Sequence, residues 1–341
     1  MCKRILVSQT NTEDGVPFYK IGTIGSTPDA YISKELFDDY KVKYNYPRKG
    51  EVMITCAGTV GKCVVYDGED AYFQDSNIVW IDNPTQYISN GFLFHLLSKV
   101  DWRKLNSTTI IRIYNDDLRN LKMSYPRKEE QQKISHLLSL LDERIATQNK
   151  IIEDLKKLKS AISERLFNAI KGDVVVLEDI GDVVKGKQIN GEFLSESGKY
   201  YVMNGGIEPS GFYNDYNVEA NTISISEGGN SCGYVQFNAC PFWSGGHCYT
   251  IQNTTDNVKT EYLYQFLKSK ESEIMKLRIG SGLPNIQKKD LAKFKITIPN
   301  ISEQKVISAF LSSFERKADV EMNFVNLLLE EKQYLLRQMF I

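Results

Sequence analysis

Apolar residues recur at alternating steps of four and three along two long stretches of this chain. This spacing is that of a coiled-coil heptad, in which the apolar positions form one seam. The first seam consists of Ile134, Leu138, Leu141, Ile145, Ile152, Leu155, Ile162 and Leu166, and the second of Ile307, Leu311, Phe314, Ala318, Val325, Leu328, Leu335 and Met339. Each stretch predicts a helix of about 40 residues and roughly 60 Å, which is too long for the interior of a small domain.

Two polar residues interrupt each predicted seam at matching places. They are Gln148 and Lys159 in the first seam, and Glu321 and Lys332 in the second. A polar residue on an apolar seam lowers stability but can fix the register and the choice of partner helix. We interpret these residues as pairing determinants, and the alternative is a local gap that is open to water.

The two stretches belong to an internal repeat. Adding 173 to the residue number maps positions 107–167 onto 280–340 without a gap, so that Pro126 falls on Pro299 and Gln131 on Gln304. The chain therefore contains two copies of a unit in which a folded segment leads through a proline into a long helix.

The two long helices have to bury their seams, and within one monomer the simplest way is to pack against each other. If the segment between them, 173–299, is compact and its ends lie close together, the helices run antiparallel. This arrangement predicts two globular units joined by an antiparallel two-helix coiled coil with approximate twofold internal symmetry.

The segments before the long helices predict similar mixed α/β domains. The runs "VMIT", "KCVVY" and "NIVWI" have β-type composition and are separated by glycine turns, and the stretch from Asn221 to Ile251 follows the same plan. A short amphipathic helix follows in "YISNGFLFHLLS" and again in "VKTEYLYQFLKS". We assign residues 1–126 to a first globular domain, 127–172 to a first long helix, 173–299 to a second domain and 300–341 to a second long helix.

The second domain opens with a segment that the first domain lacks. Aligning "CKRI" with "GKQI" leaves "VVVLEDIGDVV", which begins at Val174, without a counterpart. We therefore expect the first domain to lack its opening strand.

Composition indicates a globular protein and gives no sign of a polyanionic partner. Hydrophobic residues make up 42% of the chain, and 42 lysines and arginines nearly balance 43 aspartates and glutamates. No apolar run approaches the roughly 20 residues that span a bilayer, so we expect a cytoplasmic protein without a membrane partner. The six cysteines include no close pair of the kind that binds zinc, and we expect reduced thiols, no metal and no cofactor.

The repeat as a whole resembles the specificity subunit of type I restriction-modification systems. The resemblance rests on the two long helical segments, which begin "EEQQKISHLLSLLDERI" and "SEQKVISAFLSSFERKA", and on "GVPFYKIGTIG", "DAYFQDSNIVWI" and "LEDIGDVVKGK". It implies a non-catalytic subunit whose two target-recognition domains each read one half of a bipartite, asymmetric site in double-stranded DNA. It also implies that the coiled coil sets the spacer and docks two DNA methyltransferase subunits, with restriction subunits as further partners.

The candidate DNA-binding residues are polar or cationic side chains in or beside the glycine turns. Base edges require donors and acceptors on protruding loops, and phosphates require cations or backbone N–H groups. The candidates are Lys20, Thr59, Lys62 and Arg112 in the first domain, and Lys185, Lys187, Asn230, Arg278, Ser281 and Asn285 in the second. For each of them the alternative is a solvated surface residue. Tyr72, Phe73, Phe242 and Trp243 could stack on bases, but we expect them in the cores.

The sequence shows no catalytic set. Adenine methyltransferases need an asparagine-proline-proline-aromatic type of motif, whereas Asn83-Pro84 is followed by Thr85, and no phosphate-binding glycine-lysine loop is present. The alternatives to a DNA-reading subunit are a coiled-coil assembly scaffold without DNA specificity and a partial copy with impaired recognition.

Overall fold

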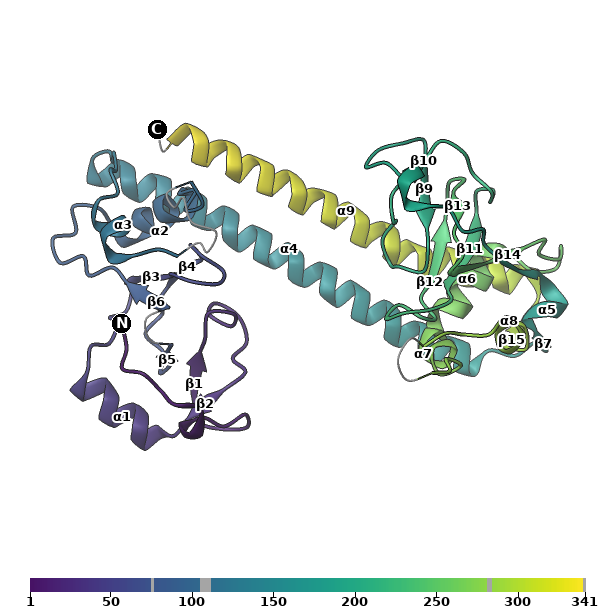
Figure 1. Ribbon diagram of the computed structural model, residues 1–341, viewed down its shortest axis with the longest axis horizontal. Helices are drawn as coiled ribbons and strands as arrows, with labels where there is room; N and C mark the ends of the chain where they lie inside the picture. Colours follow the sequence, from purple (N-terminus) through teal and green to yellow (C-terminus); the bar gives the residue numbers. More distant parts are fainter. Residues whose placement is uncertain (75–76, 105–111, 281–283, 340–341) are drawn as a thin grey trace. The chain divides into compact units, whose positions relative to one another are not determined.

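The computed structural model describes residues 1–74, 77–104, 112–280 and 284–339 (Figure 1). The chain forms two compact units, Met1–Gln148 with Phe324–Ile341, and Asn149–Asn323. Each long helix therefore contributes one part to each unit, and the two units are described separately.

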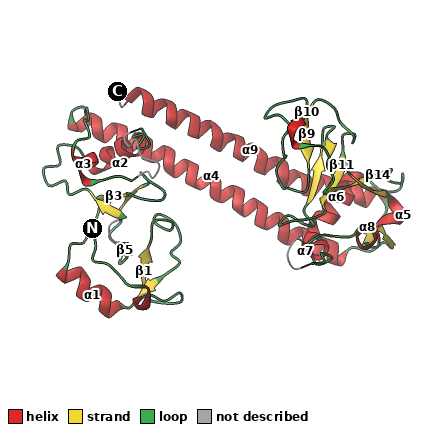
Figure 2. Ribbon diagram, viewed as in Figure 1, coloured by secondary structure: helices red, strands yellow, loops and turns green. Residues whose placement is uncertain are grey.

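The first unit combines short strands with helices (Figure 2). Its elements are β1 (Val16–Tyr19), β2 (Tyr31–Ile32), α1 (Lys34–Lys43), β3 (Val52–Thr55), β4 (Cys63–Val65), β5 (Tyr72–Phe73), β6 (Ile78–Trp80), α2 (Asn90–Lys99), α3 (Asn115–Arg119) and the first half of α4 (Lys128–Ala169), with a 3₁₀ turn at Val7–Gln9. One sheet has the strand order β2-β1-β5 and the other β4-β3-β6. A core lies under each sheet, and α2 packs on the second.

The second unit has the same plan with a larger central sheet. Its elements are β7 (Asp173–Val176), α5 (Leu177–Ile180), β8 (Asp182–Lys185), β9 (Tyr200–Met203), β10 (Phe212–Tyr213), β11 (Thr222–Ser226), β12 (Val235–Asn238), β13 (Trp243–Ser244), β14 (Cys248–Gln252), α6 (Thr260–Ser269), α7 (Glu271–Met275), α8 (Lys288–Ala292), β15 (Lys295–Ile298) and the first half of α9 (Ile301–Met339), with a 3₁₀ turn at Gly191–Phe193. The sheets have the orders β10-β9-β13, β12-β11-β14-β8 and β15-β7.

The additional opening segment of the second unit supplies two strands. β8 pairs antiparallel with β14 at the edge of the central sheet, and β7 pairs antiparallel with β15. In the described residues of the first unit the corresponding sheet, β4-β3-β6, has three strands and no strand beside β6 on that edge. The expected lack of an opening strand in the first domain stays a prediction.

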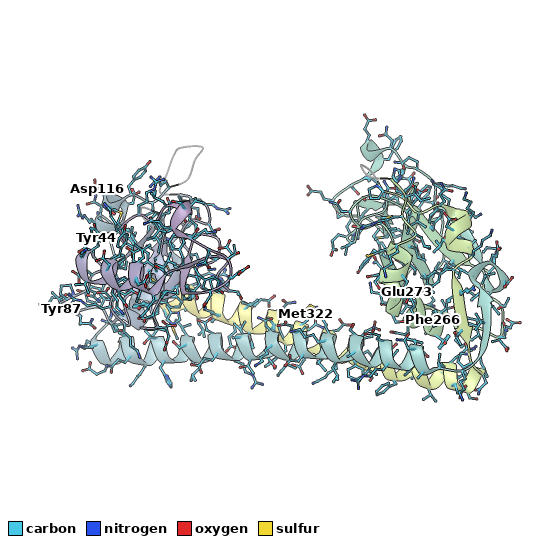
Figure 3. All side chains as sticks on the ribbon, turned by 90° about the horizontal axis from the view of Figure 1, so that it is seen from below. Tyr44, Tyr87, Asp116, Phe266, Glu273 and Met322 are labelled. Carbon is cyan, nitrogen blue, oxygen red and sulfur yellow. The ribbon has the colours of Figure 1, made fainter. Side chains whose placement is uncertain are left out.

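A buried glutamine joins each globular part to its long helix. In the first unit Gln131 donates from Nε2 to the carbonyls of Tyr87 and Pro126, at 3.0 and 2.9 Å, and its Oε1 accepts from the backbone N–H of Ser89 at 2.8 Å; Tyr87 is labelled in Figure 3. Ser89 is the N-cap residue of α2. The glutamine therefore links the start of α2, the proline turn and α4.

The second unit repeats this junction 173 positions later. Gln304 donates to the carbonyls of Asn257 and Pro299, both at 2.9 Å, and accepts from the N–H of Lys259 at 2.8 Å. Lys259 is the N-cap residue of α6. Gln131 and Gln304 are 1% and 0% exposed, so these hydrogen bonds are shielded from water and geometrically specific.

Within each unit the two long helices run antiparallel. In the first unit Ile134 and Leu138, near the start of α4, share a cluster with Leu335, Leu336 and Met339, near the end of α9. In the second unit the end of α4 and the start of α9 belong to one core. Phe167 of α4 meets Phe266 of α6 edge to face in that core, with ring centroids 5.3 Å apart. Phe266 is labelled in Figure 3.

The lysines that interrupt the seams form ion pairs between the long helices. Lys159 contacts Glu315 at 2.7 Å in the second unit, and Lys332 contacts Asp142 in the first. The two lysine side chains are only 17% and 19% exposed. For these two lysines the observation favours pairing determinants over a water-filled gap, and the 173-residue shift relates the two pairs. Glu321 instead pairs with Lys317 of its own helix.

The predicted fold class is confirmed as a mixed α and β fold with two similar units and long helices. The structure has β3, β4, β6, α2 and α6 where the sequence predicted β-type runs and short amphipathic helices. Sequence reasoning missed α1 and the sheets β2-β1-β5 and β10-β9-β13. The strands of these sheets have only two to four residues, which is too short for a clear alternating pattern. The four-part domain division stays a prediction.

Candidate nucleic-acid interface

The candidate interface of the second unit lies where β8 and β11 end. Lys185 is the last residue of β8, and its Nζ lies 2.6 Å from Oε1 of Glu227, which directly follows β11. Tyr249 of β14 donates from its hydroxyl to the same Oε1 at 3.0 Å. Burial and the Glu227 carboxylate both raise the pKa of Tyr249, so the phenol keeps its proton and remains a donor.

The backbone around Glu227 brings further candidates to the same place. Asn285 forms isolated bridges with Gly228 and with Ile279, next to Arg278. Gly229, with φ of +74°, donates to the carbonyl of Pro284 at 3.1 Å, and Asn230 follows it in the turn. A left-handed φ at this turn explains the glycine.

Two further candidates of the second unit do not belong to this group. Lys187 is exposed, and its carbonyl accepts from Nε1 of Trp243 at 2.9 Å, so it lies beside β13. Ser281 lies outside the described residues.

In the first unit Thr59 and Lys62 lie in the turn between β3 and β4. The hydroxyl of Thr55 donates to the carbonyl of Thr59 and accepts from the N–H of Lys62 at 3.0 Å. Gly61, with φ of +84°, lies so close to the ring of Trp102 that a Cβ atom would stand 2.2 Å from it. The turn that carries both candidates is therefore fixed by its own hydrogen bonds and by tight packing.

The other two candidates of the first unit have different surroundings. Arg112 precedes Ile113, whose N–H donates to the carbonyl of Cys56 at 2.9 Å. The backbone at Arg112 therefore lies beside the same turn. Lys20 follows β1 and forms an ion pair with Asp29 at 3.0 Å, which partly offsets its charge. The structure therefore groups Thr59, Lys62 and Arg112 and leaves Lys20 on another sheet.

Corresponding backbone hydrogen bonds identify equivalent positions in the two units. Ile286 donates to the carbonyl of Glu227 at 2.8 Å, as Ile113 does to that of Cys56. Burial raises the pKa of the Cys56 thiol to about 11, against the opposing effect of Arg112. A neutral thiol and a carboxylate thus occupy matching places beside the predicted DNA-binding turns.

Most of the aromatic residues considered for stacking lie in the cores. Tyr72, Phe73 and Phe242 are 0%, 3% and 0% exposed, whereas Trp243 is half-buried. The expected core role is confirmed for the first three. Trp243 takes part in the packing through an edge-to-face contact with Tyr213 at 5.3 Å.

Sequence reasoning missed Glu227, His247 and the role of Tyr249. An acidic residue at the end of a β-type run, directly before two glycines, was a visible signal in "SISEGG", but nothing local indicated that Lys185 would reach it. Among the described residues no group of histidine, cysteine, aspartate and glutamate is arranged to hold a metal ion. No helix in the described ranges is long and apolar enough to cross a membrane.

The known proteins that resemble this chain match a little under half of it or nearly all of it. A type I restriction enzyme specificity subunit of Haemophilus influenzae is 50% identical over 155 residues, covering 46% of this chain and 40% of that protein. A type I specificity subunit of Mycoplasma pneumoniae is 34% identical, covering 47% and 42%. The chain therefore spans about two fifths of these relatives. The MjaX specificity subunit of Methanocaldococcus jannaschii is 23% identical, covering 93% of this chain and 84% of that protein.

Solved structures share the fold. The crystal structure of a type I restriction-modification S subunit from M. genitalium matches with a TM-score of 0.67 at 20% identity, covering 100% of this chain and 92% of that one. The sequence profile described as "Type I restriction modification DNA specificity domain" matches twice, over residues 1–157 and 171–328. This chain therefore belongs to the family of type I restriction modification DNA specificity domains.

Proposed function

We propose that this chain is the non-catalytic specificity subunit of a type I restriction-modification complex, and that its two units read the two halves of a bipartite site in double-stranded DNA. The observation that carries the proposal is the double family match, with one copy over each half of the chain. The structure supports it, because the helical junctions are repeated while the turns beside Cys56 and Glu227 differ in chemistry. Shared junctions suit a common scaffold, and different turns suit two different half-sites.

The long helices also offer surfaces for partner subunits. Leu137 and Phe310 occupy equivalent places and are 41% and 46% exposed, and nearby Leu140 and Val306 are 48% and 70% exposed. Apolar side chains exposed in equivalent places support the docking of one methyltransferase subunit on each unit. Restriction subunits would join that complex. We expect the complex in the cytoplasm, because its proposed target DNA lies there. In this proposal residues 1–126 and 173–299 are the target-recognition domains.

Methylome sequencing of the host with and without this chain tests the proposal. We expect one bipartite methylated motif to be lost when the chain is absent. If no motif is lost, the DNA-reading function is wrong and the scaffold alternative is favoured. A lost motif with only one defined half would indicate that the first unit does not read DNA.

A change in the length of the long helices tests their role as a ruler. Seven residues inserted at matching register positions of α4 and α9 lengthen both helices by about 10 Å, the length of about three base pairs. We expect the unread spacer of the methylated motif to grow by about three base pairs. The control is the same insertion in α4 alone, which shifts one seam against the other. An unchanged spacer in the double insertion would refute the ruler.

A further inference from the structure

One carboxylate of the second unit is buried beside the candidate DNA-binding turn. Glu227 is 7% exposed, and its Oε1 accepts from Lys185 and Tyr249. Its Oε2 is fully covered and has no hydrogen-bond partner among the described residues. A buried carboxylate loses hydration that one ion pair does not fully replace, so Glu227 costs stability, and a role other than stability would explain its place here.

The fold of this turn does not require a carboxylate. In the first unit Cys56 accepts from Ile113 through its carbonyl just as Glu227 accepts from Ile286. The first unit thus builds the same strand end with a neutral, compact side chain. The two copies share the backbone hydrogen bond and differ in the side chain.

Two exposed side chains from different elements lie next to Glu227. Lys185, from β8, keeps 50% of its side chain exposed while its Nζ lies 2.6 Å from Oε1. His247, from the turn before β14, is 65% exposed, and its Nδ1 lies 3.7 Å from Oε2. The backbone fixes this turn, because Glu227 donates to the carbonyl of His247 at 2.9 Å and the N–H of His247 donates to Oδ1 of Asn204 at 3.1 Å.

We propose that Lys185, held in place by Glu227, reads a base edge in the half-site of the second unit, and that Glu227 is its positioning residue. This inference rests on the proposed DNA-reading function. The matching ligand chemistry is a pair of acceptors on one edge, such as O6 and N7 of guanine in the major groove.

The charge of the site favours a base edge over a phosphate. Lys185 and Glu227 together carry no net charge, and a phosphate on Lys185 would stand within a few ångströms of the carboxylate and be repelled by it. Base acceptors carry no formal charge, so this repulsion is much smaller for them. A flexible lysine suffices for a phosphate, whereas base reading requires a fixed donor, and Glu227 supplies that constraint.

The difference between the units supports the same assignment. The carbonyl of Asn77 accepts from the N–H of Cys56, just as the carbonyl of His247 accepts from the N–H of Glu227. Cys56 and Asn77 in the first unit therefore stand where Glu227 and His247 stand in the second. Domains that read different half-sites are expected to differ at base-reading positions and to agree at structural ones.

The test measures DNA binding by the complex purified from the host through a tag on this chain. The probes are a labelled 40-base-pair duplex that carries the methylated motif, duplexes with single base-pair changes in the half-site, and a scrambled duplex. For Lys185→Gln we expect the preference for one base pair to fall by about 5- to 150-fold, with the salt dependence unchanged. For Glu227→Gln we expect the ratio of specific to scrambled affinity to fall, because Lys185 is freed to bind any phosphate.

Lys293→Ala is the matched control, because Lys293 is an exposed lysine of the second unit that is not a DNA-binding candidate and forms no ion pair with the described residues. It should leave the base preference intact. Glu227→Cys introduces the side chain that the first unit has at the matching position. It therefore removes the carboxylate with a residue that the matching turn of the first unit accommodates.

Two outcomes would overturn the inference. If Lys185→Gln weakens all duplexes equally and lowers the slope of log affinity against log salt by about 0.9, Lys185 binds a phosphate. If Glu227→Gln and Glu227→Cys both leave the specific-to-scrambled ratio unchanged, Glu227 is only structural. If the unaltered complex prefers no duplex, the proposed function itself fails, which is a distinguishable result.

Discussion

Replacing Gln131 with glutamate should strongly destabilise the first unit. The substitution exchanges one NH₂ group for an oxygen, so it creates no cavity. The side chain can still accept from Ser89, but it loses the two donors that reach the carbonyls of Tyr87 and Pro126. A carboxylate would then face two carbonyl oxygens at a position that is 1% exposed in the native chain.

The expected size follows from these contacts. Two lost hydrogen bonds remove about 0.5–1.5 kcal/mol each, and leaving buried acceptors unsatisfied adds to this, for a total of about 3–5 kcal/mol. For a unit of this size the loss corresponds to a fall in Tm of roughly 6–20 °C. Differential scanning calorimetry of the full chain measures it, with the transition of the second unit as an internal reference.

Gln132→Glu is the control, because Gln132 is the next residue on α4 and is exposed. It should shift Tm by less than about 2 °C, since surface substitutions usually change stability by under about 0.5 kcal/mol. Burial should raise the pKa of the carboxyl introduced at position 131 above its unfolded value of about 4.3. Its destabilising effect should therefore shrink as the pH falls toward that value. Equal Tm values for the two variants would refute the role assigned to Gln131.

Two further predictions concern charges near the long helices. Burial lowers the pKa of His95, so the unfolded chain takes up its proton first, and the first unit should lose stability as the pH falls below about 6.5, by at most about 1.4 kcal/mol per pH unit. His95→Gln should remove this dependence in urea unfolding at pH 5.5 and 7.5, and an unchanged slope would contradict it. Lys159→Glu should destabilise the second unit by about 1–3 kcal/mol, and adding Glu315→Lys should restore most of the loss, because the pair is half-buried at 2.7 Å. A double variant no more stable than the single one would show that the pair does not contribute.

The local periodicity of apolar residues predicted most of the architecture. The seams around Leu138 and Leu311 predicted two long helices, and the structure has them at Lys128–Ala169 and Ile301–Met339. The 173-residue repeat also indicated that Gln131 and Gln304 are equivalent. The sequence could not show that these glutamines bind the starts of α2 and α6, because those partners lie more than 40 positions away.

The sequence by itself determined the repeated plan of this protein, because helical periodicity and repeat register are properties of neighbouring residues. Only the tertiary structure decided which carboxylates meet Lys159 and Lys332, and that Lys185 reaches Glu227. These pairs join residues 156, 190 and 42 positions apart. Such contacts depend on how the chain returns to itself, so no local pattern specifies them. The proposed DNA-reading chemistry depends on contacts of this second kind.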